Sequence, residues 1–306
     1  MTRHGLSIST ITRIIHQLFN ERLTGKYRWK RGPILDRLQW DVFKWFYTRI
    51  RPTFSTFFVN STAHLQHMHW RNMEPDPFKV KPSDSEQQEY QGAILFGYEE
   101  MDHIVGDALK LAGDSTVLIL ASALGQQPCV IYEDIGGKTF YRPRVFEKVL
   151  EYAGVTEKFT ISPVMAEEFQ VLFESVAAGQ QAKARLRALR VNGKAALRAE
   201  GDGSVLHCGC PIFEKLPDNV LLERDLEPGN WPFFRLFYQV EGLKSGMHHP
   251  DGIFWIRLPG KPGQPRLEQK IPLKDVAPTI LQILGLKKPD YMTGRALKLS
   301  IGATCH

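Results

Sequence analysis

Five histidines lie in two short stretches of this chain and could bind a metal ion. His64, His67 and His69 are closely spaced, and the second stretch reads His248-His249-Pro250-Asp251-Gly252. Imidazole-rich sites suit Zn, Cu or Ni. Asp251 could orient one of the imidazoles, or it could be an ordinary turn residue. The alternative for the whole set is that these histidines line a pocket and hydrogen-bond locally.

Two other patterns could carry chemistry, and both have a plainer explanation. Cys208 and Cys210 could bind a soft metal, but two thiols on one strand are more often buried packing. The chain has four cysteines and no zinc-finger spacing, so we expect reduced thiols in a cytoplasmic protein. The run at 136–138 (Gly-Gly-Lys) lacks the spacing of a phosphate-binding loop, which favours a hairpin turn.

Alternating strands and helices are expected to position these side chains. Residues 53–60 and Thr116–Ala121 are apolar runs of strand length, and residues 87–112 between them fit one long helix. A continuous apolar run is typical of a parallel strand that is buried on both faces. The sequence therefore predicts an α/β protein whose core is a mostly parallel sheet flanked by helices.

Later segments complete this picture. Residues 143–215 read as a small inserted α+β subdomain, with a hairpin from Ala195–Glu200 to Val205–Cys208. Residues 253–258 return to the character of a core strand, and Asp275 to Gly285 fit a helix with both caps. We thus expect a basic helical segment at 1–52, a core from 53–142 and 216–306, and the subdomain at 143–215.

The first 52 residues hold eleven Lys and Arg but only three acidic residues, in a chain of net charge +6. Residues 7–19 read as an amphipathic helix with Ile11, Ile15 and Phe19 on one side. Such a basic segment could attract phosphates, nucleic acid or an acidic membrane surface, or be a solvated helical face. Nucleic-acid binding rests on charge alone and is disfavoured, whereas a protein partner could bind these helices. No apolar run approaches the roughly 18 residues of a transmembrane segment.

Motif order adds a resemblance to a known family. The late histidines are followed by a strand and then by a Pro-Thr helix, residues 273–285, that ends on a glycine. This order resembles the C-terminal signature of the alkaline phosphatase superfamily, most closely its type I phosphodiesterase/nucleotide pyrophosphatase branch. The resemblance covers roughly residues 40–300, the second half or two-thirds of a full-length member.

The resemblance implies two metal ions held by Asp and His at four places. His67 and His248 match two of the histidine positions, and His249 is a neighbour. Ala63 stands where the family's Asp-x-x-x-His segment has aspartate. Ser122-Ala123-Leu124-Gly125 stands where it has Ser-Asp-His-Gly. The N-terminal Asp with its Thr or Ser nucleophile has no counterpart.

Two functions remain open. The resemblance implies metal-dependent hydrolysis of phosphate or sulfate esters, with a phosphorylated or sulfated small molecule as substrate and this activity impaired or lost here. The alternative is a non-catalytic pseudoenzyme that acts as a binding or assembly module. The metal ligands would be His67, His248 and His249, and the cofactor Zn, another divalent metal, or none. We expect this site where the ends of 53–60 and 116–121 meet the loop at 246–252.

Overall fold

A computed structural model describes residues 5–165, 167–224, 231–240, 242–261 and 270–299. The chain divides into two compact units. Unit 1 comprises residues 1–75, 82–128 and 246–306, and unit 2 comprises residues 76–81 and 129–245. Each unit therefore joins segments that are far apart in the sequence.

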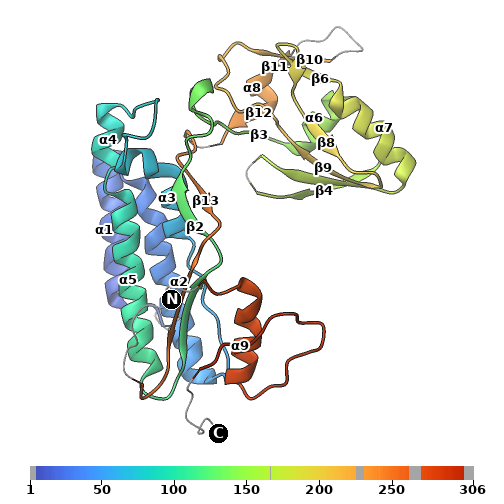
Figure 1. Cartoon of the computed structure of the whole chain (residues 1–306). Helices are drawn as coiled ribbons and strands as arrows, with labels where there is room; N and C mark the ends of the chain where they lie inside the picture. The colour runs from blue at the N-terminus through green and yellow to red at the C-terminus, as the bar shows by residue number, and fades with distance from the viewer. Residues whose placement is uncertain (1–4, 166, 225–230, 241, 262–269, 300–306) are drawn as a thin grey trace. The chain divides into compact units, whose positions relative to one another are not determined.

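Helices dominate unit 1. They are α1 (Ile8–Thr24), α2 (Arg31–Ile50), α3 (Ser61–Met73), α4 (Asp84–Tyr90), α5 (Ala93–Ala112) and α9 (Val276–Ile283), with 3-10 turns at Arg28–Lys30 and Leu273–Asp275. α1 packs against α2, and both α2 and α3 pack against α5, so that α1, α2 and α5 run side by side (Figure 1). The helix predicted at 87–112 is two helices, α4 and α5, separated at Gln91 and Gly92.

Local capping explains several of these boundaries. The Ser7 hydroxyl accepts a hydrogen bond from the Thr10 amide at the start of α1, and Gly25 ends that helix in a left-handed conformation. Ser83 and Glu86 form a reciprocal capping box at the start of α4. The predicted helix at 275–285 is confirmed as α9, with Asp275 at its N-cap and Gly285 at a φ of 68° just past its end.

An antiparallel ribbon completes unit 1. β1 (Leu118–Ser122) pairs with β14 (Ile253–Arg257), and β2 (Gly125–Pro128) pairs with β13 (Gly246–His249). Two residues, 123–124, oppose three, 250–252, where the two pairs meet, so the ribbon contains a bulge. A Cβ on Gly252 would lie 1.8 Å from the Ser122 carbonyl oxygen, so only glycine allows this close approach.

Unit 2 contains small antiparallel sheets around an apolar core. Its sheets have the strand orders β4-β5-β9-β8, β11-β10-β6-β7 and β12-β3. The strands are β3 (Tyr141–Pro143), β4 (Phe159–Pro163), β5 (Phe169–Phe173), β6 (Leu189–Val191), β7 (Lys194–Ala195), β8 (Arg198–Glu200), β9 (Val205–Gly209), β10 (Leu221–Arg224), β11 (Trp231–Pro232) and β12 (Phe237–Gln239). The helices are α6 (Phe146–Tyr152), α7 (Val176–Arg187) and α8 (Phe233–Leu236), with a 3-10 turn at Glu133–Ile135.

The core of unit 2 has a simple origin in the sequence. Phe169, Val171 and Phe173 alternate along β5, which places all three on the buried face of the sheet. Leu206 and Cys208 on the neighbouring β9 join the same cluster. The predicted hairpin is confirmed, because β8 pairs with β9 and Ala199 lies opposite Cys208.

The prediction of a mostly parallel sheet is wrong. Every strand pair that the described residues form is antiparallel, and the sheets have only two to four strands. The apolar run that indicated a central parallel strand is β1, whose partner β14 runs in the opposite direction. An apolar run indicates that a strand is covered, but it carries no information about the direction of the neighbouring strand.

Residues 53–60 were expected to form a buried strand and do not. They form neither a strand nor a helix, and Phe54 and Phe58 are exposed. Phe57 instead packs its ring against Trp40 and Phe43 of α2, at 5.0 and 5.3 Å between centroids. Within the described part of the chain, no helix is long and apolar enough to cross a membrane.

Candidate functional site

Three elements of unit 1 bring two of the predicted histidines together. His67 lies on α3, while His248 on β13 lies directly opposite Gln126 on β2. β13 approaches α3 closely at Gly246, where a Cβ would lie 2.3 Å from the Gln66 carbonyl oxygen. The rings of His67 and His248 are 4.8 Å apart and nearly perpendicular.

Hydrogen bonds define how these rings are held. His67 Nδ1 lies 2.9 Å from the Gly246 carbonyl oxygen. A carbonyl can only accept, so Nδ1 carries the proton and a neutral His67 presents its lone pair at Nε2. Gln126 Nε2 lies 3.3 Å from His67 Nε2 and 3.1 Å from His248 Nδ1. The single amide group therefore donates one hydrogen to each imidazole.

This arrangement has some features of a metal site and lacks others. A histidine that donates Nδ1–H to a backbone carbonyl is oriented as metal-bound histidines commonly are. Two imidazole lone pairs converge on one point, but that point is occupied by an amide nitrogen. Among the residues that the structure describes, no group of three or more His, Cys, Asp or Glu side chains could hold a metal ion. The donors here are neutral, so they do not fit a pair of divalent ions.

The carboxamide oxygen of Gln126 differs from the amide nitrogen in its contacts. It is buried and has no hydrogen-bond partner within the described part of the chain. Rotating the amide would direct this oxygen toward the two imidazoles, so the cluster could also accommodate protonated rings.

His249 and Asp251 do not join this cluster. The Asp251 backbone N–H donates to His249 Nδ1 at 3.1 Å. The Asp251 carboxylate forms an ion pair with Lys270 at 2.6 Å, and the hydrogen bond from Lys270 lowers the pKa of Asp251. Asp251 therefore lies in the bulge of the ribbon, and its carboxylate pairs with a lysine.

His69 belongs to the packing of the helices. Its ring stacks on Tyr90 at 4.6 Å with an interplanar angle of 9°. Burial, together with the neighbouring charge of His64, lowers the pKa of His69 to about 4. His64 is exposed on the same helix.

The hydroxyl groups of Ser61, Thr62 and Ser122 have structural partners. Ser122 Oγ donates to the Leu124 carbonyl at 2.6 Å, which closes the turn before β2. Ser61 donates to the Asp36 carboxylate, and Thr62 Oγ1 donates to the Gly97 carbonyl at 3.1 Å. In these positions the hydroxyls stabilise helix packing and a turn.

The remaining candidates lie in unit 2. Burial raises the pKa values of Cys208 and Cys210 to about 12, so both thiols remain protonated and act as apolar packing. Lys138 lies over the rings of Tyr132, Phe140 and Phe213, with Nζ 4.0 to 4.8 Å from their centroids. Burial lowers the pKa of Lys138. Its ammonium group makes cation–π contacts with these rings and does not belong to a phosphate-binding loop.

Sequence reasoning missed Gln126. It directly follows Gly125 at the end of the Ser-Ala-Leu-Gly turn, and only the antiparallel pairing of β2 with β13 places it opposite His248. A glutamine in a strand is an ordinary residue, so nothing in the sequence singles it out. Comparison with protein-family models, curated proteins and solved structures finds no match to this chain.

Proposed function

We propose that this chain is a non-catalytic binding or assembly module. Its motif order resembles the alkaline phosphatase superfamily, and in this proposal the hydrolysis of phosphate or sulfate esters has been lost. The supporting observation is the Gln126 amide, which hydrogen-bonds both His67 and His248 and occupies the point between them.

Charge is the physical reason. Two divalent ions need several carboxylates to offset their charge, and they stabilise the charge that develops on a transferring phosphoryl group. His67 Nε2 and His248 Nδ1 accept hydrogen bonds from the Gln126 amide, and none of the three side chains supplies a negative charge. Ala63 and Ala123, which stand where the resemblance implies aspartates, carry no group that can bind a metal. Losing these ligands would abolish hydrolysis but would leave a binding surface unaffected.

Metal content and turnover test this proposal together. The full-length protein is purified without chelators, analysed for Zn, Mn and Ni, and assayed with an aryl phosphodiester and an aryl sulfate. We expect less than stoichiometric metal and no turnover above a buffer blank. Stoichiometric metal together with turnover that His67→Ala abolishes would overturn the proposal.

A second candidate is a site for one metal ion. The convergence of His67 Nε2 and His248 Nδ1 on one point favours it, because both carry lone pairs in the observed arrangement. Zn is one of the metals that imidazole ligands suit. Calorimetric titration with Zn²⁺ tests this candidate, and His249→Ala is its control because His249 lies outside the cluster.

A phosphorylated or sulfated small molecule is the ligand class that the resemblance implies for such a module. Titration with inorganic phosphate tests this ligand class directly, with binding monitored through the NMR signals of the His67 and His248 rings. We also place the module in the cytoplasm, a proposal supported by the buried free thiols of Cys129, Cys208 and Cys210.

A further inference from the structure

Helix α1 presents its apolar side to solvent and its polar side to the protein. Ile8, Ile15, Phe19 and Leu23 are exposed by 78, 62, 60 and 68%. They are separated by seven, four and four residues, so they lie on one face of the helix. Thr10, Gln17 and Glu21 have the same kind of spacing on the opposite face and are only 2 to 9% exposed. Globular proteins normally bury the apolar face of a helix instead.

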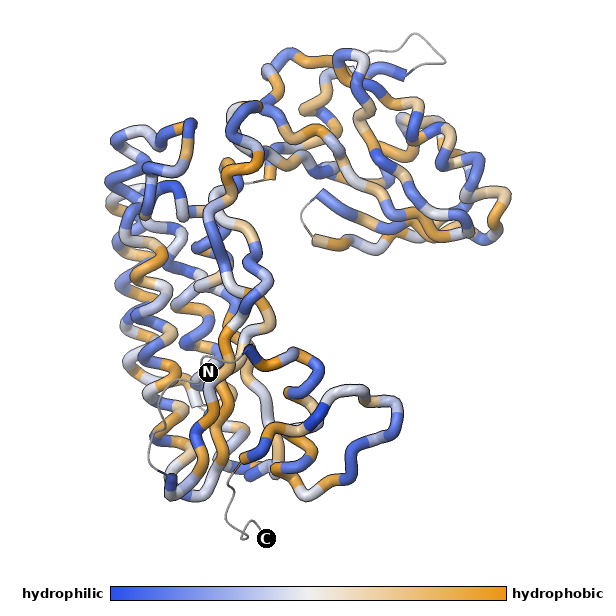
Figure 2. The backbone as a smooth tube through the Cα atoms, viewed as in Figure 1, coloured by the Kyte–Doolittle hydropathy of each residue, from blue (hydrophilic) through white to orange (hydrophobic). Residues whose placement is uncertain are grey.

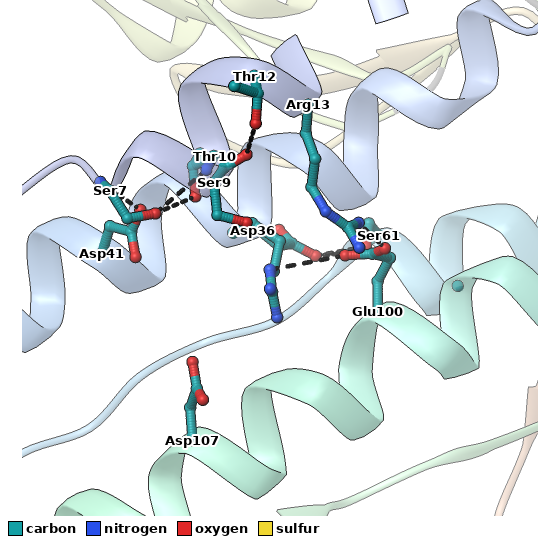
Figure 3. Close-up of polar contacts among 12 residues, drawn as sticks. Ser7, Ser9, Thr10, Thr12, Arg13, Asp36, Asp41, Ser61, Glu100 and Asp107 are labelled. Carbon is teal, nitrogen blue, oxygen red and sulfur yellow. Dashed lines mark hydrogen bonds and ion pairs between the residues drawn. The ribbon is translucent and has the colours of Figure 1, made fainter. Parts of the chain in front are cut away.

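Specific contacts hold α1 in this orientation. The Ser7 N–H donates to the Asp41 carboxylate at 2.9 Å at one end of the helix. Gln17 Nε2 donates to the Tyr27 carbonyl at 2.7 Å, and Glu21 pairs with Arg31 at the other end. In the middle, Arg13 reaches Glu100 on α5, as Figure 3 shows beside the Ser7, Thr10 and Asp41 group. Turning the helix over would break these contacts and leave the buried Asp41 and Glu100 carboxylates without these partners.

Acidic side chains near α1 are also turned toward the protein, whereas a basic side chain on its outer face is exposed. Glu21, Asp36 and Asp41 are the only acidic residues before residue 53, and all three are buried. Glu21 accepts from Arg31, Asp36 from Ser61, and Asp41 from Ser7. Arg22 remains exposed, on the same face as Ile15, seven residues away. The outer face of α1 is therefore apolar and cationic.

Helix α2 repeats the pattern. Leu35, Phe46 and Ile50 are exposed and are separated by eleven and four residues, which places them on one helical face. Arg49 lies beside them with its guanidinium 3.9 Å from the ring of Trp45. Apolar residues recur along the length of these helices (Figure 2).

We propose that the outer face of α1 binds the surface of an anionic lipid membrane. This inference names a partner for the proposed binding module. It rests on the proposed function only in assuming that the chain is such a module. A helix with an apolar face and cationic residues lies in the membrane interface, with its apolar side chains among the acyl chains and its cations near lipid phosphates.

Other occupants fit this face less well. A second copy of the chain packed on the same face would bring Arg22 near its own counterpart, and like charges repel. Nucleic acid would use the cations but would leave the aliphatic side chains of Ile8, Ile15 and Leu23 without an apolar environment. An anionic lipid surface complements both the charge and the hydrocarbon.

Vesicle co-sedimentation of the full chain tests the proposal. We expect the protein to sediment with phosphatidylcholine vesicles that contain phosphatidylserine, and to bind weakly to phosphatidylcholine alone. Phe19→Gln should weaken binding at least tenfold. Arg22→Glu should weaken it about fivefold or more on the anionic vesicles, since one basic residue near such a surface contributes about that factor. Added salt should reduce binding of the wild-type protein.

The matched control is Val176→Gln, an equally exposed apolar residue at the start of α7 in unit 2. It should leave vesicle binding unchanged. All three altered side chains are exposed on their helices, so circular dichroism should show unchanged melting.

Equal sedimentation of wild type and Phe19→Gln, or no sedimentation with anionic vesicles, would overturn the proposal. So would a dimer in light scattering that Phe19→Gln converts to a monomer. Metal content and ester turnover are measured separately, so failure here is distinct from failure of the proposed function.

Discussion

Gln126 determines the chemistry available at the histidine cluster, because its amide holds both imidazoles. Gln126→Ala removes this amide from both imidazoles. We expect Zn²⁺ or Ni²⁺ to bind about tenfold more tightly than to the wild type, since about 1.4 kcal/mol of hydrogen bonding no longer has to be broken. Isothermal titration calorimetry measures the change.

Gln127→Ala is the control for this change. The Gln127 amide donates to the His248 carbonyl at 3.0 Å, so it lies next to the cluster without contacting either ring in that bond. Its loss should leave metal affinity unchanged. Equal affinities for all three proteins would show that Gln126 does not restrict access to the imidazoles.

His69 makes stability depend on pH. Its pKa is about 4 in the folded protein, against an ordinary value of 6.5, because burial disfavours the charged ring. The unfolded chain therefore binds more protons between these values. Stability that is fully present above about pH 6.5 is lost as the pH falls toward 4, by at most roughly 3 kcal/mol.

Urea unfolding across this pH range measures the effect. His69→Phe keeps an aromatic ring on Tyr90 and removes the titrating group. The variant should lose less stability than the wild type between pH 6.5 and 4. Parallel curves for the two proteins would contradict the assignment of a depressed pKa to His69.

At the scale of elements, the ribbon that carries Gln126 and His248 depends on close backbone contacts. A Cβ on Gly252 would overlap the Ser122 carbonyl. Gly252→Ala should therefore destabilise unit 1 by about 1–3 kcal/mol, because the two strands must separate to admit the methyl group. Denaturant unfolding followed by the fluorescence of Trp255 on β14 reports the change.

Gly106→Ala is the control, because the same substitution at this position should stabilise the protein. Gly106 lies inside α5, and an added Cβ would meet nothing within 4 Å. Alanine loses less backbone freedom on folding, so this variant should be more stable by about 0.5–1 kcal/mol. Destabilisation by both substitutions to the same extent would contradict the steric account of Gly252.

At the scale of the whole molecule, the two units have separate apolar interiors. The larger cluster lies entirely in unit 2, whereas the cluster of Leu65, Ala93 and Ile94 lies in unit 1. Leu206 is fully buried on β9 in the first of these. Leu206→Ala should therefore destabilise unit 2 by about 2–5 kcal/mol.

Hydrogen exchange of the full chain distinguishes the units. Amides of β5 and β9 should lose protection in Leu206→Ala, while those of α5 should change much less. An equal loss of protection in both units would show that they unfold as one cooperative body.

The sequence alone determined the elements that depend on neighbouring residues. The amphipathic character of residues 7–19, the hairpin through Gly201 and the capped helix before Gly285 all follow from local spacing and turn chemistry. The resemblance predicted that His67 and His248 belong to one site, and the structure brings their rings to 4.8 Å of each other. The metal ligation that this resemblance implies stays a prediction.

Tertiary structure decided what depends on distant partners. The direction of β14 beside β1, the position of Gln126 between two histidines, and the outward turn of the apolar side of α1 are all set by pairings across many residues. Periodicity shows that α1 has two faces. The ion pair of Glu21 with Arg31 and the hydrogen bond of Ser7 to Asp41 determine which face lies inward. The histidine spacing therefore predicted which imidazoles could act together, whereas strand pairing determined that the Gln126 amide lies between them.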